Sequence, residues 1–478
     1  MSLSSRHSLS IALLVAGAFF MENLDGTVIA TALPQMAKSF NASPVSLNVG
    51  MTAYMLTLAV FIPISGWIAD RFGTRTIFGS AIAVFTVSSI FCGFSYGIGE
   101  FIAARVIQGI GGAMMVPVGR LVVLRNAQKE NLLNAVAYIT WPGLVAPVLG
   151  PPLGGFITTY ASWRWIFFLN VPLGLIGVAL TGLLIKNSRS DTVRPFDVIG
   201  FSASAIACST LMYAMELIGQ QPTPWFTFIL LFALSLLAGG LMVFHSGRHH
   251  APLIDLSALS IRTFAVTIRG GSLFRIAISV IPFLLPLLFQ IGFGLSAYTS
   301  GLFVLAVFAG NLGMKTVTTP VIRFFGFRRV LIGNGLLTTL SLFACAFLTP
   351  ATPLAAIIAI LFFGGLCRSM QFTSLNTLGF ADIPPEQMSA ATTFASMIQQ
   401  MTMGMGVAVG AIALRVAAIM HHGSSASPTI ADFHFAFVLI SIVALISVSD
   451  FLKLDPDAGA VVSGHQRYFN QGAEPKVQ

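Results

Sequence analysis

Two carboxylates in the first long apolar segment are the residues best placed to do chemistry. Glu22 and Asp25 are three positions apart, so on a helix they share one face. Both lie well inside residues 9–33, a run long enough to cross a bilayer, where an isolated carboxylate costs a few kcal/mol. Such groups must lie in a bundle interior or a wet cavity, and they are typical of proton and substrate paths. The alternative is a structural pair that bonds to a neighbouring helix and never titrates.

The composition excludes most soluble classes. The chain has 478 residues, of which 56% are hydrophobic and only 9% charged, whereas soluble proteins carry about 25% charged residues. Because the apolar runs have helix length and do not alternate, we predict an all-α polytopic membrane protein. The net charge of +9 sits in short loops, so it indicates membrane orientation rather than nucleic-acid binding. No phosphate-binding loop, metal cluster or nucleophile–base motif stands out, so we expect neither an enzyme nor a cofactor.

About fourteen spans of roughly 20 residues or more account for the apolar runs. They lie near residues 9–33, 47–68, 77–96, 99–123, 134–158, 163–185, 197–218, 225–245, 263–290, 297–320, 327–348, 352–377, 389–419 and 431–452. Basic residues gather in every second loop, which is the positive-inside pattern. This bias favours an even number of spans and a multi-pass protein with both termini in the cytoplasm.

A short basic turn occurs twice, each time after the second span of a group of six. The first copy is Arg71-Phe72-Gly73-Thr74-Arg75 and the second is Phe324-Phe325-Gly326-Phe327-Arg328. We therefore predict two six-helix bundles in parallel repeat, an arrangement common in transporters. The predicted units are an N-terminal bundle at 1–190, two additional linker helices at 191–260, a C-terminal bundle at 261–455 and a cytoplasmic tail at 456–478.

Five motifs between residues 24 and 174 carry a family resemblance. They read LDGTVIATALP from Leu24, GWIADRFGTR from Gly66, RVIQGIGG from Arg105, GPPLGG from Gly150 and WRWIFFLNVPLG from Trp163. In this order and on these spans they resemble the major facilitator superfamily, and in particular its fourteen-span drug:proton antiporter branch. The chain departs from that pattern at Ala30, where the branch usually has Asn, and at Ala146, where the fifth-span motif usually opens with Gly.

The resemblance implies roles for these motifs. The turn formed by Asp70, Arg71, Gly73 and Arg75 would latch two halves of the protein together, with Asp70 facing the start of the thirteenth span, which Ser389 could cap. Asp25 would carry protons beside Arg105, and Glu22 is the second candidate proton carrier. The motif that comprises Gly150, Pro151, Gly154 and Gly155 goes with antiport in exporters. The alternatives are a loop that only sets topology, a permanent ion pair and a packing motif.

Other polar residues on the spans are candidates for a substrate cavity. Arg275, near the middle of the ninth span, is the least expected cation. It could pair with Glu22 or Asp25, meet an anionic group of a substrate, or have a purely structural partner. The remaining candidates are Gln108, Trp141, Gln290, Gln371 and Gln399. Glu216 and Arg415 lie near outer ends, where solvated positions are expected.

These features predict a secondary transporter that exports small amphipathic or toxic molecules as protons enter, by alternating access. The expected partners are a small-molecule substrate, protons and the lipid bilayer, with no nucleic acid, and the protein is expected to be a monomer driven by the proton motive force. A dedicated exporter of one metabolite, a lipid flippase and an uptake symporter are the alternatives, and the fifth-span motif disfavours uptake. A non-transporting sensor would not need paired charges in the membrane.

Overall fold

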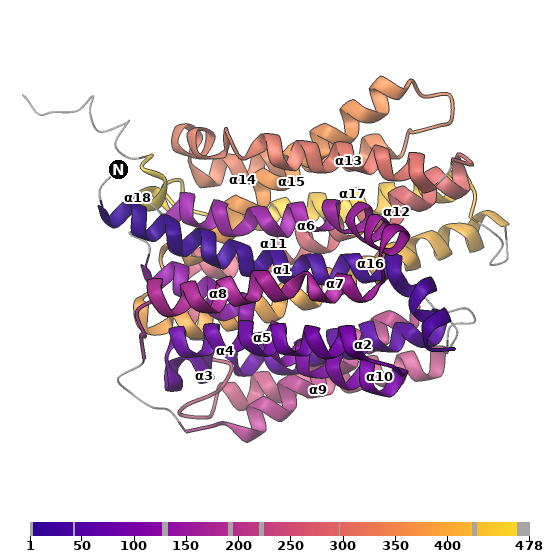
Figure 1. Cartoon of the computed structure of the whole chain (residues 1–478). Helices are drawn as coiled ribbons and strands as arrows, with labels where there is room; N and C mark the ends of the chain where they lie inside the picture. The colour runs from indigo at the N-terminus through magenta and orange to yellow at the C-terminus, as the bar shows by residue number, and fades with distance from the viewer. Residues whose placement is uncertain are drawn as a thin grey trace, which may run out of the picture.

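The computed structural model describes residues 3–41, 44–126, 132–189, 195–218, 224–295, 297–422 and 428–465. Within these residues every regular element is a helix, and most of the helices are long and run nearly parallel to one axis (Figure 1). This confirms the predicted all-α polytopic fold. In the described residues, 11 helices are long and apolar enough to span a membrane, or up to 12 if a bent pair forms one span.

The first group of helices ends near residue 184. Its members are α1 (Leu3–Ser39), α2 (Pro44–Phe61), α3 (Ser65–Phe72), α4 (Thr74–Phe94), α5 (Ile98–Asn126), α6 (Leu132–Tyr160), α7 (Arg164–Phe168) and α8 (Asn170–Leu184). A 3-10 turn, Ile62–Ile64, joins α2 to α3, so both belong to one span. Helix α1 packs along α6, α8 and α5, while α4 packs against α5 and α8.

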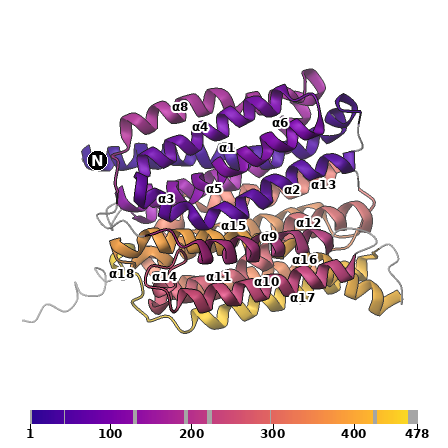
Figure 2. The same ribbon diagram turned by 90° about the horizontal axis from the view of Figure 1, so that it is seen from below.

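The second group begins near residue 262. Its members are α11 (Arg262–Ser279), α12 (Ile281–Leu287), the π-helix η4 (Leu288–Gly292), α13 (Ala297–Met314), α14 (Thr318–Cys345), α15 (Leu354–Ala381), α16 (Met388–His422), α17 (Ile430–Phe451) and α18 (Ala460–Ser463). The predicted span 263–290 consists of α11, α12 and η4 in succession. Pro282 is the second residue of α12, and because proline has no N–H to donate to a helix hydrogen bond, one helix ends and the next begins at this point. In Figure 2 the two groups occupy opposite sides of the molecule.

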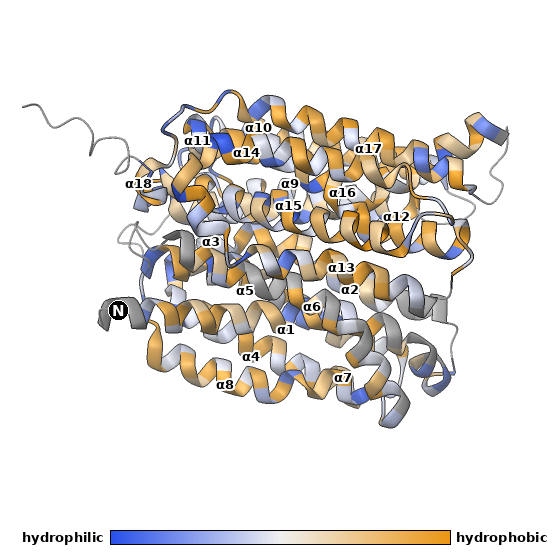
Figure 3. Ribbon diagram, turned by 90° about the horizontal axis from the view of Figure 1, so that it is seen from above, coloured by the Kyte–Doolittle hydropathy of each residue, from blue (hydrophilic) through white to orange (hydrophobic). Residues whose placement is uncertain are grey.

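Two helices lie between these groups in the sequence, α9 (Val198–Ile218) and α10 (Trp225–Ser246). They pack on each other, and α9 contacts α2 of the first group and α16 of the second. Most of α10 keeps its apolar side chains exposed, as does most of α8, and both helices are largely orange in Figure 3. Exposed apolar surface on peripheral helices is what a bilayer solvates.

The two basic turns adopt the same backbone conformation. Gly73 lies between α3 and α4 with φ 95° and ψ 142°, and Gly326 interrupts α14 with φ 77° and ψ 161°. Glycine reaches this region without the penalty that a Cβ imposes. The second turn differs from the predicted boundary, since α13 ends at Met314 and α14 already begins at Thr318, with an 83° bend between them. Gly326 therefore stands where the eleventh span was predicted to begin, but it lies within α14 rather than in a loop between two helices.

Basic side chains gather at the end of the bundle where α1 begins, on the left of Figure 1. We call this end the basic end; its residues include Arg71, Arg75, Arg125, Lys186, Arg189, Arg248, Arg262, Arg323, Arg328 and Arg329. The first and second groups meet there, because α3 and the 3-10 turn Ile62–Ile64 pack against α16.

Candidate functional site

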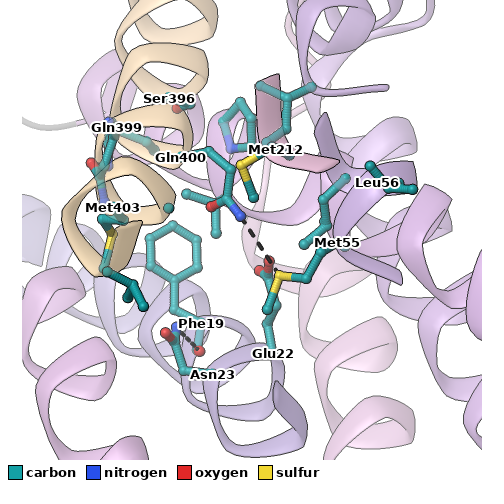
Figure 4. A pocket seen from close by; sticks show the side chains of 18 of the residues that line it. Phe19, Glu22, Asn23, Met55, Leu56, Met212, Ser396, Gln399, Gln400 and Met403 are labelled. Carbon is teal, nitrogen blue, oxygen red and sulfur yellow. Dashed lines mark hydrogen bonds between the residues drawn. The ribbon is translucent and has the colours of Figure 1, made fainter. Parts of the chain in front are cut away.

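A cavity of about 720 Å³ lies between the two groups of helices. It is lined from one side by α1, α2 and α5 and from the other by α15 and α16, with α9 closing part of the wall. Figure 4 shows Gln399, Gln400 and Met403 of α16 across from Glu22 and Met55. Phenylalanine and methionine supply much of the surface, and a few polar groups project into it, as in typical small-molecule sites.

Asp25 is held in a closed network of hydrogen bonds beside this cavity. Its Oδ2 receives Nη1 of Arg105 at 2.6 Å, and its Oδ1 receives the amides of Gln108 and Asn170, each at 3.0 Å. Ser89 accepts from both amides, at 2.8 and 3.2 Å. Four helices, α1, α4, α5 and α8, each contribute to the network, so the carboxylate fixes their relative positions.

This network is sealed from water. Asp25 is 2% exposed and Arg105 is 1% exposed, and Tyr54 covers the guanidinium with its ring centroid 4.2 Å from Cζ. An ion pair with so many additional donors offsets much of its desolvation cost. Both predicted partners are therefore in contact, but in this conformation neither faces the cavity.

Glu22 lies on the same helix in a different setting. Its side chain lines the cavity, next to Gly112 of α5. Its Oε2 is buried and has no hydrogen-bond partner among the described residues. A buried carboxyl oxygen without a partner is costly, and the cost is relieved by a proton, a water molecule or a ligand. Of the two predicted carboxylates, Glu22 is the one that a substrate can reach.

The turn at the basic end holds its charges mostly within the first group. Asp70 accepts from Nη2 of Arg125 at 2.9 Å, and Arg71 lies over the Trp67 ring. Gly73 provides the left-handed turn, and the Asn187 side chain packs directly against it. Arg75 is exposed at the start of α4.

The contact between the groups at this end is made by small residues near the turn. Ser389 of α16 donates its hydroxyl to the Gly66 carbonyl at 3.2 Å, so it does not cap the helix as suggested from the sequence. Ser65 and Thr393 hydroxyls lie 3.4 Å apart, and a Cβ on Gly66 would collide with Thr393. The cavity is therefore closed at the basic end by tight packing of α3 against α16.

The glycine motif on α6 brings that helix close to α1. A Cβ on Gly150 would collide with Thr27, whose hydroxyl lies 3.5 Å from the Ala146 carbonyl. Gly154 is buried, whereas a Cβ on Gly155 would meet nothing within 4 Å. The Pro151 side chain lies outside the described residues. Because Thr27 stands two positions after Asp25, α1 and α6 approach each other closely beside this candidate proton-binding residue.

The predicted cavity residues lie in four kinds of places. Gln399 lines the cavity and accepts from Arg120 at 3.1 Å. Gln108 belongs to the Asp25 network, and Gln371 joins α15 to α14 through Asn334 and the Leu331 carbonyl. Gln290 is exposed in η4 and does not line the cavity. The Trp141 side chain lies outside the described residues.

The chain is similar to known proteins in both sequence and structure. The sequence profile of the Major Facilitator Superfamily matches residues 15–407. The chain belongs to the major facilitator superfamily. Two relatives carry the name "Putative multidrug resistance protein MdtD": one from Pectobacterium atrosepticum is 36% identical over 93% of this chain and 95% of its own, and one from Escherichia coli O6:H1 is 38% identical over 90% and 92%.

Solved structures agree on the fold. The human organic anion transporter MFSD10 matches 94% of this chain and all of its own, with a TM-score of 0.65 at 13% identity. The proton:xylose symporter XylE matches 97% and 99%, with a TM-score of 0.64 at 15% identity. The protein is therefore a multi-pass major facilitator transporter, not an enzyme.

Sequence reasoning missed several charges that this major facilitator protein brings to its centre. Arg120 lines the cavity, and Lys315, at the break after α13, donates to Thr373 at 2.8 Å. Glu216 was expected in solvent but lines the cavity and accepts from Thr52 at 2.6 Å. A count of every cation inside the predicted spans would have found Arg120 and Lys315, since each costs free energy unless it has a partner or a function.

Arg275 does not make the carboxylate pair that was one of the alternatives for it. It pairs with neither Glu22 nor Asp25, since its Nη2 donates to the Asn376 amide oxygen at 3.3 Å. Its side chain is only 5% exposed, and its Nε and Nη1 have no partner among the described residues. Asp25 already has Arg105, which is why no second arginine is drawn to it.

Proposed function

We propose that this major facilitator protein is a proton-driven exporter of small amphipathic compounds. The observation that carries the proposal is that α1 holds two carboxylates in two environments. Asp25 is locked against Arg105 outside the cavity, and Glu22 faces the cavity with an unpartnered oxygen. A protein that exchanges a proton for a substrate needs one acidic group that senses the substrate and a second whose pairing depends on helix packing.

The proposed units that move relative to each other during transport are the bundles at 1–190 and 261–455. Helices α9 and α10 are the proposed linkers, and residues 456–478 form the proposed tail. The main helix contacts fall within the two groups, and the cavity lies between them, in keeping with rocking around a central site. In the conformation described, the contact between Gly66 and Ser389 closes the basic end. We take the basic end to be cytoplasmic, so that both termini lie inside a bacterial cytoplasmic membrane.

In this scheme the substrate leaves toward the outside and protons enter at the emptied site. Protonation of Asp25 would remove the charge that holds Arg105, so the contacts among α1, α5 and α8 would loosen and the bundles could rearrange. Glu22, which shares the helix, would bind a donor group of the substrate or take up a proton when the substrate has left. The names of the relatives support export of drug-like molecules.

A dedicated metabolite exporter is the second candidate. It is favoured by the charged lining of the cavity, where Arg120, Arg368 and Glu22 are polar anchors that a purely apolar drug site does not need.

Transport by purified protein in liposomes with an imposed pH gradient tests the proposal. A panel of lipophilic cations, neutral dyes and lipophilic anions would be followed for gradient-driven movement by the wild type and by Asp25→Asn. The expected result is gradient-dependent movement of several compounds that is lost in Asp25→Asn while binding survives. Absence of any movement by the wild type would count against polyspecific export, and a search among metabolites would follow.

A further inference from the structure

Three arginines from both groups of helices lie in or next to the wall of the cavity. Arg120 of α5 and Arg368 of α15 line the cavity, and Arg275 of α11 reaches Asn376, which also lines it. Arg120 and Arg275 are 7% and 5% exposed, and they are close enough to repel each other. Charges of one sign brought together at low exposure need a compensating charge.

None of the three arginines has that compensation within the described part of the chain. Among the described residues, Arg120 donates to Gln399 at 3.1 Å and Arg275 donates to Asn376 at 3.3 Å, and both acceptors are neutral amides. Nε of Arg368 and two nitrogens of Arg275 have no partner there. Arg105 shows the contrast, since it has Asp25 at 2.6 Å.

The carboxylates of the cavity lie elsewhere. Glu22 rests against Gly112, and Arg120 follows Gly112 by eight residues on α5, which is about 12 Å along the helix. Glu216 accepts from Thr52 on the wall formed by α9 and α2. Arg120 and Arg275 therefore lie toward the basic end and apart from these acidic groups, whereas Arg368 precedes Asn376 by eight residues on α15, which is about 12 Å along that helix.

We propose that Arg120 and Arg275 form a subsite for the acidic head group of an amphipathic organic anion, and that Arg368, farther along α15, adds positive charge to the same cavity. This inference rests on the proposed transport function and names its substrate class. A planar carboxylate or sulfonate matches the paired donors of guanidinium groups. The apolar body of the substrate would lie along Phe19, Met55 and Met212, which line the same cavity.

The arrangement of α15 supports the subsite. Arg368, Phe372, Asn376 and Phe380 follow at intervals of four residues, so they form one face of the helix, and all four line the cavity. The Arg368 guanidinium lies over Phe372, 5.9 Å from the ring centroid, and Arg120 lies at the same distance from Phe380. Each ring restricts the side-chain conformation of its arginine, and the N–H groups of the guanidinium remain available to other partners.

The subsite also joins the two bundles. Arg120 belongs to the first group of helices, whereas Arg275 and Arg368 belong to the second. A bound anion would therefore draw α5 toward α11 and α15, and its departure would return the repulsion between Arg120 and Arg275. Binding and release of the head group would thus favour different packings of the bundles.

A matched set of ligands tests the subsite by binding to the purified full-length protein. Pyrenebutyrate, its neutral amide and the pyrenebutylammonium cation share one apolar body, and pyrene fluorescence reports their binding. The anion is expected to bind the wild type about tenfold or more tightly than the amide, as charge-assisted hydrogen bonds would give. Arg275→Gln and Arg368→Gln should each reduce this preference and leave amide affinity unchanged, with partial retention in Arg368→Lys.

Arg262→Gln is the control, since Arg262 is exposed and pairs with Asp455 far from the cavity. Unchanged amide binding shows that each variant is folded. Equal wild-type affinity for anion and amide would overturn the subsite, even if liposomes still move lipophilic cations and the export proposal stands. Preferential anion binding that depends on the arginines would uphold the subsite, even if no compound moves along a pH gradient and the export proposal fails.

Discussion

Asp25 and Glu22 illustrate how much three positions on a helix can matter. Residues three apart differ in direction by about 60° around the axis, and this is enough to turn Asp25 into the interface with α5 and α8 while Glu22 faces the cavity. One carboxylate has three donors and the other has an oxygen without a partner. Their roles follow from these neighbours rather than from their residue types.

At the residue scale, Asp25→Asn should be costly because it leaves Arg105 buried without its counter-charge. We expect a loss of about 3 kcal/mol or more in stability, measured by thermal unfolding of the purified protein. The double variant Asp25→Asn with Arg105→Gln should regain much of this stability, since no charge remains, yet should still lack pH-driven transport. A double variant less stable than the single one would contradict the compensation described here.

Glu22→Gln, unlike Asp25→Asn, should leave the stability of the protein nearly unchanged. Because Glu22 makes no hydrogen bond through Oε2 among the described residues, its neutral isostere should change stability by no more than about 0.5 kcal/mol. Transport should lose its dependence on the pH gradient, as measured by dye movement in liposomes with and without the gradient. Transport that responds to the gradient as in the wild type would remove Glu22 from the coupling path.

At the scale of single elements, the contact between α1 and α6 depends on one glycine of the motif. Gly150→Ala places a methyl group against Thr27 and should cost about 1–3 kcal/mol. Gly155→Ala on the same helix meets open space and should be neutral or stabilise by up to about 1 kcal/mol. Thermal unfolding of the two variants side by side makes the comparison, and equal effects would show that the motif does not set the helix contact.

The pair α9 and α10 depends on a buried carboxylate outside the membrane-spanning segments. Asp197 is 4% exposed, and it accepts N–H groups of Gly200 and Leu253 and pairs with His245 at 2.8 Å. Burial by itself would raise the pKa of Asp197, but these hydrogen bonds and the His245 interaction together lower the pKa below its ordinary value. The ionised form is therefore the one that stabilises the fold.

The sign of the pH effect follows from that direction. A carboxylate with a depressed pKa contributes stability above its unfolded pKa, about 3.9, and loses it as the pH falls through the lower folded value. Asp197→Asn should therefore lower the free energy of unfolding by about 1–2 kcal/mol at neutral pH, because the carboxylate that caps the start of α9 by accepting the Gly200 N–H is lost. The loss should be smaller at acidic pH. Unfolding temperatures of both proteins across an acid titration measure this, and a constant difference would refute the assignment.

At the scale of the whole molecule, the contact between α3 and α16 should open and close during transport. Ser65 and Thr393 hydroxyls are 3.4 Å apart across this contact, so Ser65→Cys with Thr393→Cys should form a disulfide under oxidation. We expect oxidation to stop transport in liposomes and reduction to restore it. The wild type, whose four native cysteines are buried, is the control and receives the same oxidant. Undiminished transport by the cross-linked protein would rule out opening at this end.

The sequence by itself determined the membrane class, the repeated basic turn and the family, because each depends on local composition or on short motifs. Span lengths follow from the thickness of a bilayer, and Gly73 and Gly326 hold the same conformation because the same turn recurs. The contact between Asp25 and Arg105 was also within reach, since both lie in the same half of their helices.

Only the tertiary structure decided which charges share the cavity. Arg120, Arg275 and Arg368 are far apart in the sequence, and the packing of α5, α11 and α15 brings them into or next to the wall of one cavity. The same packing places Gln371 in a helix contact, Gln290 at the surface and Glu216 in the cavity wall. Helical periodicity fixes which residues share a face, but the direction of each face depends on neighbouring helices that no local pattern encodes.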